Sequence, residues 1–256
     1  MALTDNVSPY YKLDGNSNDD STTSYNGTDT NITYSDANGI INNGAGFNST
    51  SSKILLPSAI KQTGSFSFAC WFKTDTILQA EQYITSDWSE HGRNYLLRMK
   101  LANLTFLSGN GSTSQDPTLT NDTTLSADTW YHVVFVRDGT TIKIYLNGSE
   151  DGTSTGSYTG GSTSNITYLG TGVKSSANDF FDGAIDEVGF WSRALTTTEI
   201  TTLYNGGDGL QYPFVTTSIK SINGLAKASI KSRNGLAIAS IKSINGLQQI
   251  YGIKRN

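Results

Sequence analysis

Cysteine is nearly absent from this 256-residue chain, and no segment is long and apolar enough to cross a membrane. The single thiol, Cys70, lies in an apolar run, where we expect a buried side chain rather than a reactive one. One cysteine cannot form a disulfide within the chain, so nothing indicates an oxidising compartment. The first residues also lack the basic start and apolar core of a signal peptide. We therefore expect no membrane insertion.

Sequence patterns that indicate catalysis or zinc binding are also missing. A retaining glycosidase needs two carboxylates about 5 Å apart, and no Glu-x-Asp-x-Glu sequence supplies them. Asp186 and Glu187 are adjacent, so a regular strand would turn them to opposite faces. The two histidines, His91 and His132, are distant, and no His or Cys pair has zinc-site spacing. These absences favour a non-enzymatic protein, with a polysaccharide-degrading depolymerase as the weaker alternative.

Acidic residues are absent after Asp208, whereas seven basic residues follow it. The whole chain has 18 basic and 22 acidic residues, so the part up to Asp208 has 11 basic residues and a net charge of −11. An acidic body thus precedes a tail of charge +7. Single-strand nucleic-acid binders interleave basic with stacking aromatic residues, and this tail contains few aromatics. We expect an acidic protein partner for the tail and no nucleic acid.

Short apolar segments separated by Gly, Ser, Thr and Asn predict an all-β domain over residues 1–213. The clearest strand is 65–74, where every second residue is Phe or Cys. Further strands are expected at 82–86, 95–107, 166–170 and 183–191. Asp138-Gly139 predicts a tight turn that joins strands 129–137 and 141–146 into a hairpin.

Three segments, in this order, resemble the laminin-G-like or concanavalin A-like lectin and glucanase jelly rolls. They are YYKLDGNSNDDS (10–21), TWYHVVFVRDGTTIKIYLNGSEDG (129–152) and FDGAIDEVGFWSRALTTTEITTLYNGG (181–207). In the last segment, Thr196 and Glu199 have the spacing of a capping box, and a short helix follows them. The resemblance implies a two-sheet jelly roll that binds glycans or protein surfaces.

Two sites are expected in this domain. The resemblance implies one structural calcium ion between the first and last strands, held by Asp14 and Asp186, although Asp14 could equally cap a turn. A candidate ligand-binding cluster is Trp88, His91, Arg93 and Tyr95, which combines aromatic faces with hydrogen-bond donors suited to sugars. An ordinary solvated loop is the alternative for this cluster.

The tail, residues 214–256, repeats Ser-Ile-Lys-Ser-x-Asn-Gly with a period of 11. Asn-Gly pairs between β-prone runs predict hairpins, so we expect a β-meander of four strands. Alternation gives the meander a nearly uncharged face, which we expect to oligomerise the chain, with a homotrimer favoured. This face includes Ile219, Ala226, Ala228, Ile230, Ala237, Ala239 and Ile241.

A laminin-G-like head on a repeat-built tail resembles bacteriophage structural proteins. The resemblance implies a virion surface protein (a head fibre, decoration protein or tail adhesin), assembled in the host cytoplasm, that binds host-surface glycans through its head. Its basic tail would attach to other virion proteins. A purely structural decoration protein without glycan binding is the alternative.

Overall fold

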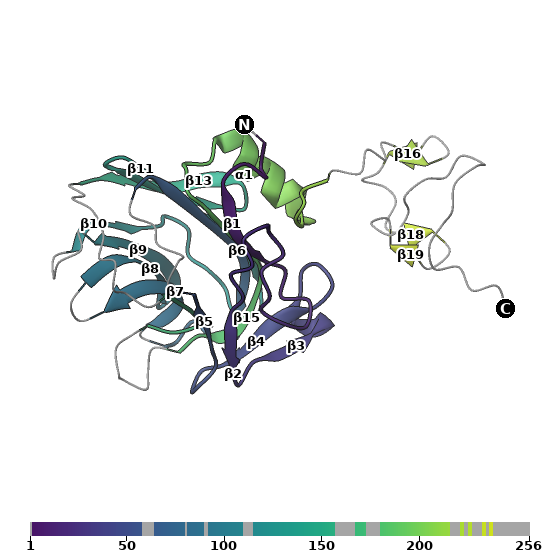
Figure 1. The fold of residues 1–256 in the computed structure, drawn as a ribbon, viewed down its shortest axis with the longest axis horizontal. Helices are drawn as coiled ribbons and strands as arrows, with labels where there is room; N and C mark the ends of the chain where they lie inside the picture. Colours follow the sequence, from purple (N-terminus) through teal and green to yellow (C-terminus); the bar gives the residue numbers. More distant parts are fainter. Residues whose placement is uncertain are drawn as a thin grey trace. The chain divides into compact units, whose positions relative to one another are not determined.

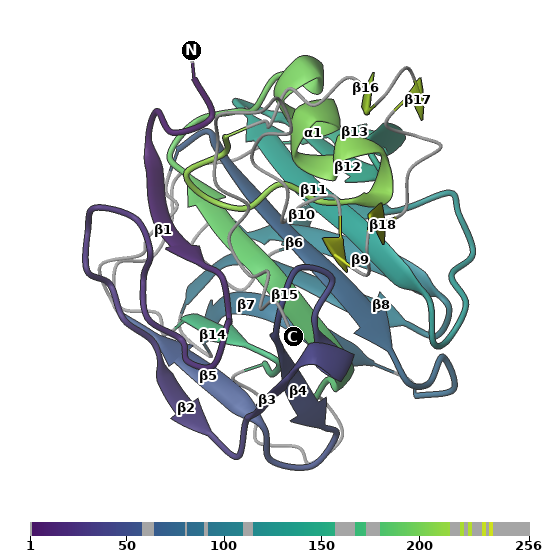
Figure 2. The ribbon, with the colours of Figure 1, turned by 90° about the vertical axis from the view of Figure 1, so that its right-hand side faces the viewer.

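Two antiparallel β-sheets packed face to face form the larger part of the protein (Figures 1 and 2). The computed structural model describes residues 2–57, 64–79, 81–89, 92–109, 115–156, 167–172 and 180–215, and the short stretches 221–222, 225–226, 232–233 and 236–237. The two-sheet, all-β class predicted from the sequence is confirmed. The described chain divides into two compact units, residues 1–214 and 215–256.

The first sheet has eight strands in the order β13-β12-β11-β6-β15-β4-β3, with β1 paired to β15. The strands are β1 (Val7–Tyr11), β3 (Thr33–Ser35), β4 (Gly44–Asn48), β6 (Phe66–Thr74), β11 (Trp130–Asp138), β12 (Thr141–Leu146), β13 (Ser149–Thr155) and β15 (Asp182–Trp191). A short 3-10 turn, η1 (Asp36–Asn38), follows β3. The predicted hairpin is confirmed, since Asp138 pairs with Thr141 across a turn in which Gly139 has a φ of +58°.

The second sheet has seven strands in the order β10-β9-β8-β7-β14-β5-β2. The strands are β2 (Thr28–Thr30), β5 (Lys53–Leu56), β7 (Gln82–Ser89), β8 (Gly92–Lys100), β9 (Asn103–Gly109), β10 (Gln115–Thr120) and β14 (Thr167–Leu169). Alternate residues of both sheets fill the space between them, for example Phe68, Phe72 and Phe135 opposite Leu97 and Phe106. These side chains form the main hydrophobic core.

The first sheet is buried on its outer face as well. Helix α1 (Thr197–Tyr204), followed by the 3-10 turn η2 (Asn205–Gly207), packs Ile200 and Leu203 against Val134 and Tyr145 of β11 and β12. Figure 2 shows α1 lying across these strands. This second core explains why nearly every residue of β6 is buried, although its sequence alternates between large and small side chains.

Helix α1 begins at the predicted capping box. The Thr196 hydroxyl accepts a hydrogen bond from the Glu199 amide, and the Glu199 carboxylate accepts one from the Thr196 amide. Arg193 donates two hydrogen bonds to the same carboxylate, at 2.7 and 2.9 Å. The helix ends at Asn205, which adopts the left-handed conformation common at helix ends.

A β-bulge in β15 changes the directions in which the side chains of Asp186 and Glu187 point. The pairing of β15 with β6 shifts between Asp186 and Gly189, and Glu187 has a φ of +52°. Both Asp186 and Glu187 therefore contact groups beyond the outer face of the first sheet. The prediction that these residues face opposite ways was wrong, because it assumed a regular strand.

The tail is described only in short pieces. Strand β16 (Ser221–Ile222) pairs with β17 (Leu225–Ala226), and β18 (Ser232–Arg233) pairs with β19 (Leu236–Ala237). In both pairs, an Asn-Gly dipeptide separates the strands in the sequence. The rest of the predicted meander lies outside the described residues, as do Ile219, Ala228, Ile230, Ala239 and Ile241. The oligomerising face therefore stays a prediction.

Candidate functional site

The predicted ligand-binding cluster lies at the tip of the β7–β8 hairpin, where Trp88 pairs with Arg93. The side chains of Trp88 and Arg93, and all of His91, lie outside the described residues. Tyr95 is completely buried between the sheets, with its ring 5.1 Å from that of Phe66. Its prediction as a ligand contact was wrong, because the register of β8 turns Tyr95 inward into the core.

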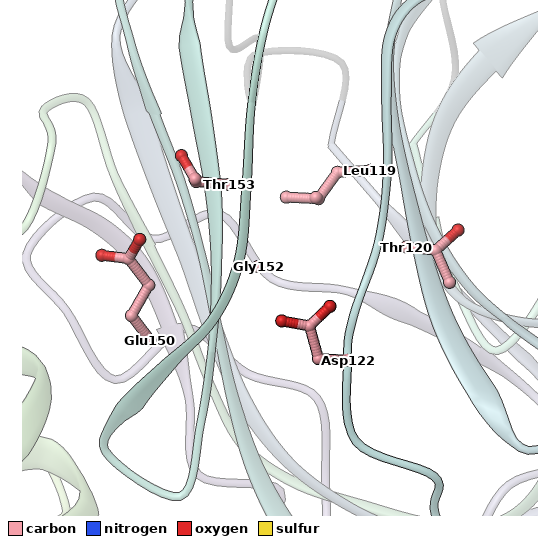
Figure 3. A pocket seen from close by; sticks show the side chains of 6 residues that line it. All are labelled: Leu119, Thr120, Asp122, Glu150, Gly152 and Thr153. Carbon is pink, nitrogen blue, oxygen red and sulfur yellow. The ribbon is translucent and has the colours of Figure 1, made fainter.

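A pocket of about 430 Å³ opens where the edge strands of the two sheets meet, β10 of one and β13 of the other. Six residues line it: Leu119, Thr120, Asp122, Glu150, Gly152 and Thr153. In Figure 3, Gly152 lies between Asp122 on one side and Glu150 and Thr153 on the other. The part of the pocket at Gly152 therefore has no side chain, and the carboxylates of Asp122 and Glu150 lie on either side of it.

A hydrogen-bond network beside the pocket joins the two sheets. The Asp151 carboxylate of β13 accepts hydrogen bonds from Asn121 Nδ2 at 2.8 Å and from the Thr123 hydroxyl at 2.7 Å. The Asp122 amide donates to the Asp151 carbonyl oxygen at 3.1 Å. Asn121 Oδ1 in turn accepts from the Leu104 amide at 2.8 Å. These bonds fix the backbone that carries Asp122 against β13.

Gly152 is required for this close approach. Its φ is +145°, which side-chain-bearing residues rarely adopt. A Cβ atom there would lie 3.2 Å from Leu119 Cδ1 and 3.4 Å from the Thr120 carbonyl oxygen. A glycine inside a strand marks such approaches. The glycine in SEDGTST was therefore the one sequence signal for this pocket, which the sequence analysis missed.

The pocket lining is rich in hydrogen-bonding groups above a small apolar surface. Glu150 forms an ion pair with Lys143 at 2.7 Å, and both side chains are partly exposed. Asp122, Thr120 and Thr153 are exposed, whereas Leu119 is buried. Carboxylates accept strong hydrogen bonds from hydroxyl donors, and threonines both donate and accept. This combination suits a small polyhydroxylated ligand.

The predicted calcium residues lie elsewhere, where β1 and β15 meet the segment after α1. Asp186 is fully buried, and its carboxylate accepts hydrogen bonds from the backbone amides of Ile40, Ile41 and Glu187 at 2.9 to 3.1 Å. These three bonds use most of its acceptor positions. Burial nevertheless raises the pKa of Asp186 to about 7.

Glu187 lies beside it in a network with Asp14. The Gln211 side-chain amide donates to Glu187 at 2.7 Å and to Asp14 at 3.1 Å, and the Tyr10 hydroxyl donates to Glu187. Burial and the neighbouring Asp186 charge raise the pKa of Glu187. None of the ion pairs within the described part of the chain involves these three acids. The cluster thus brings three carboxyl groups together without a cationic side chain paired to any of them in the described part of the chain.

The carboxylate and amide oxygens of this cluster suit calcium, but their arrangement differs from the expected site formed by Asp14 and Asp186. Asp186 is held by backbone amides, and Glu187 rather than Asp186 shares Gln211 with Asp14. Among the described residues, no group of three His, Cys, Asp or Glu side chains is arranged to hold a metal ion.

Comparison with known protein families identifies the class. Residues 48–201, more than half of the chain, match the family model described as the concanavalin A-like lectin/glucanases superfamily. The chain belongs to this superfamily, as the laminin-G-like resemblance implied. A search of curated protein sequences gives no match. Among the described residues, no helix has the length and apolar character of a membrane span.

Several solved structures share the fold of this chain. Domain 4 of AbnA, a GH43 extracellular arabinanase from Geobacillus stearothermophilus in complex with arabinotriose, is 23% identical with a TM-score of 0.61, covering 76% of this chain and 96% of that domain. The binding domain of Paraclostridial Mosquitocidal Protein 1 is 17% identical with a TM-score of 0.65, covering 80% of this chain. The chain spans only 53% of that toxin domain.

A structure of botulinum neurotoxin type C, whose description reports cell entry dependent on two ganglioside molecules, is 14% identical with a TM-score of 0.61. It covers 79% of this chain, which spans 51% of the toxin chain. At these identities the similarity establishes the shared fold.

Proposed function

We propose that the jelly roll is a non-enzymatic carbohydrate-binding domain and that the pocket between β10 and β13 binds a neutral sugar. The observation that carries the proposal is the pocket itself. Asp122, Glu150 and two threonines surround a space of about 430 Å³ that is also lined by Gly152. This volume is within the usual range for small-ligand sites. The arabinanase domain that complexes arabinotriose has the same fold over almost its whole length, which supports the same ligand class.

A neutral sugar fits the charges of the pocket. Its hydroxyl groups donate hydrogen bonds to the Asp122 and Glu150 carboxylates, and the apolar side of its ring covers Leu119. An acidic sugar would be repelled by the same carboxylates. Lys143 lies 2.7 Å from the Glu150 carboxylate and fixes its position at the pocket.

The test is calorimetric titration with arabinotriose and a panel of neutral oligosaccharides. We expect Asp122→Asn and Glu150→Gln each to weaken binding by about ten- to a hundredfold, because a hydrogen bond to a charged group contributes about 1.5 to 3 kcal/mol. Asp128→Asn, at an exposed turn residue away from the pocket lining, is the matched control. Failure of every neutral sugar to bind, or unchanged binding by both pocket variants, would contradict the proposal.

The presence of two carboxylates in one pocket also keeps glycan hydrolysis as a second candidate function. Incubation with polysaccharides distinguishes the two, since a depolymerase releases new reducing ends and a binding domain does not. If reducing ends appear and Glu150→Gln abolishes them, the domain is an enzyme.

We propose further that the tail joins several copies of the chain, with a trimer favoured, and attaches them to other proteins of a virion. The support is the 11-residue repeat and the basic charge after Asp208. Several heads on one assembly would strengthen weak binding to host-surface glycans by avidity. A decoration protein without glycan binding is the alternative, and binding to host cells separates the two.

A structural calcium ion held by Asp14 and Glu187 is also part of this proposal. Calcium prefers carboxylate and amide oxygens, and Gln211 would present its side-chain oxygen in place of the amide group that now lies between the two acids. The ion would offset the negative charge of the cluster.

A further inference from the structure

The outer face of the second sheet carries one continuous row of side chains across all seven strands. Pairing in register places Thr28 beside Leu55, Leu55 beside Tyr168, and Tyr168 beside Ser86. The row continues through Leu96 and Leu107 to Thr118 on β10. Residues that pair directly across strands point to the same face, so this face presents an apolar row with a hydroxyl-bearing residue at each end.

The two ends of the row differ in exposure. Leu96 and Leu107 form a small buried cluster with Tyr83, and Gly172 lies against the Tyr83 ring. At the β14–β5–β2 end, Leu55 is 37% exposed, Tyr168 is half-buried, and Thr28 and Thr30 are exposed. An apolar and aromatic surface flanked by hydroxyl groups is therefore accessible only at this end of the row.

A lysine completes this surface, which we call the Tyr168 platform (Thr28, Thr30, Lys53, Leu55 and Tyr168). Lys53 Nζ lies 5.5 Å from the centre of the Tyr168 ring. Within the described part of the chain, its ammonium group has no hydrogen-bond or ion-pair partner. Lys53 thus places a positive charge within a part of the chain, up to Asp208, whose net charge is −11.

Another lysine on the opposite sheet shows what is distinctive about Lys53. Lys73 Nζ lies 5.4 Å from the centre of a Trp130 ring, but it also donates a hydrogen bond to the Ala37 carbonyl oxygen. The geometry of the two lysine–aromatic pairs is thus nearly the same. Of these two ammonium groups, that of Lys53 is the one left to pair with a ligand.

We propose that the Tyr168 platform is a second binding site, for a sugar that carries a carboxylate. The sugar ring packs on Tyr168 and Leu55, its carboxylate pairs with Lys53, and its hydroxyl groups meet Thr28 and Thr30. Aromatic side chains provide large flat apolar contact surfaces, and a lysine–carboxylate pair supplies a charge-assisted hydrogen bond. The platform thus selects acidic sugars, whereas the pocket between β10 and β13 selects neutral ones.

The experiment compares binding of trigalacturonic acid and of the neutral galactose trisaccharide with the same linkage to the full chain carrying Asp122→Asn, in which the proposed pocket is weakened, by calorimetry at low salt. We expect the acidic trisaccharide to bind at least about tenfold more tightly, and Lys53→Gln to remove that difference, as the loss of a hydrogen bond to a charged group implies. Lys53→Arg retains the charge and should retain the preference. Raising the ionic strength should weaken the acidic ligand selectively.

Two further variants distinguish this site from the pocket and from a general charge effect. Lys73→Gln removes the same charge from the matched lysine and should leave binding of trigalacturonic acid unchanged, and this ligand should bind equally well with and without Asp122→Asn. The proposal is overturned if trigalacturonic acid does not bind, if it binds no better than the neutral trisaccharide, if Lys53→Gln has no effect, or if Lys73→Gln weakens binding equally. Loss of neutral-sugar binding alone would overturn only the proposed pocket.

Discussion

At the scale of single residues, Asp186 and Glu187 make the stability of this protein depend on pH. Burial raises the pKa of Asp186 to about 7, so the folded state binds a proton more tightly than the unfolded chain does. The stabilisation from this group is complete below the ordinary Asp pKa of 3.8 and is lost as the pH rises through about 7. The raised pKa of Glu187 acts in the same direction. Bound calcium would reverse the effect by favouring the charged carboxylates.

We therefore expect the contribution of Asp186 and Glu187 to the free energy of unfolding in EDTA to fall by roughly 2 to 4 kcal/mol between pH 4 and pH 8, since each pKa unit is worth about 1.4 kcal/mol. Asp186→Asn retains an oxygen for the Ile40 and Ile41 amides and does not ionise, so the difference in stability between the wild type and this variant should change with pH, while the contribution of His132 cancels from it. Urea denaturation at both pH values measures this, with Asp128→Asn as control.

The calcium proposal is tested in the same samples. Added calcium should restore stability at pH 8 in the wild type but not in Asp14→Asn. If the difference between the wild type and Asp186→Asn in EDTA did not change with pH, the charge argument would be contradicted, and a wild type that calcium leaves unchanged would contradict the metal site.

The contribution of His132 to stability changes with pH in the direction opposite to that of Asp186 and Glu187. It is buried beside Trp71, burial lowers its pKa to about 3, and its Nδ1 atom has no hydrogen-bond partner among the described residues. The folded state therefore excludes the imidazolium form, and stability from this group is lost as the pH falls below its ordinary pKa of 6.5. The ring of Tyr204, 6.1 Å from the imidazole, also covers His132.

Helix α1 is the element whose start depends most clearly on local sequence. Thr196→Ala removes the hydroxyl that caps the Glu199 amide and should cost about 1 kcal/mol. For a domain of this size, that corresponds to a melting temperature lower by about 2 to 4 °C. Thr197→Ala, one exposed residue later, has no capping bond to lose and is the matched control. Equal melting temperatures for both variants would show that the capping box contributes nothing.

Elements defined by neighbouring residues were predictable, and those defined by distant residues were not. The Asp138-Gly139 hairpin and the Thr196–Glu199 capping box each depend on a few consecutive side chains and were found from the sequence. The bulge at Glu187 depends on how β15 meets β1 and β6, and it was missed. Tyr95 was misassigned for the same reason, because the pairing of β8 decides which face it joins.

At the scale of the whole molecule, the described contacts assign Phe214 to the head. Its ring lies 5.2 Å from Tyr10 and 6.0 Å from Trp191, so the compact unit ends one residue after the predicted boundary at 213. A shortened chain that ends at Val215 keeps this packing intact. Val215 is therefore the appropriate place to separate head from tail.

We expect the truncated chain, residues 1–215, to remain folded and monomeric, because both hydrophobic cores lie within it. The full chain should form oligomers through the tail. Light scattering or mass photometry of the two proteins side by side measures their masses. A trimeric truncated chain, or a monomeric full chain, would contradict the assignment of assembly to residues after 214.

The sequence by itself determined the all-β class, the acidic head with its basic tail, the main hairpin and the capped helix, because each depends on composition or on residues close along the chain. Only the tertiary structure decided the sites. Asp122 and Glu150 meet because the edges of two sheets adjoin at Gly152, and Lys53 reaches Tyr168 because β5 pairs with β14. Strand register and sheet packing bring together residues that no short stretch of sequence connects.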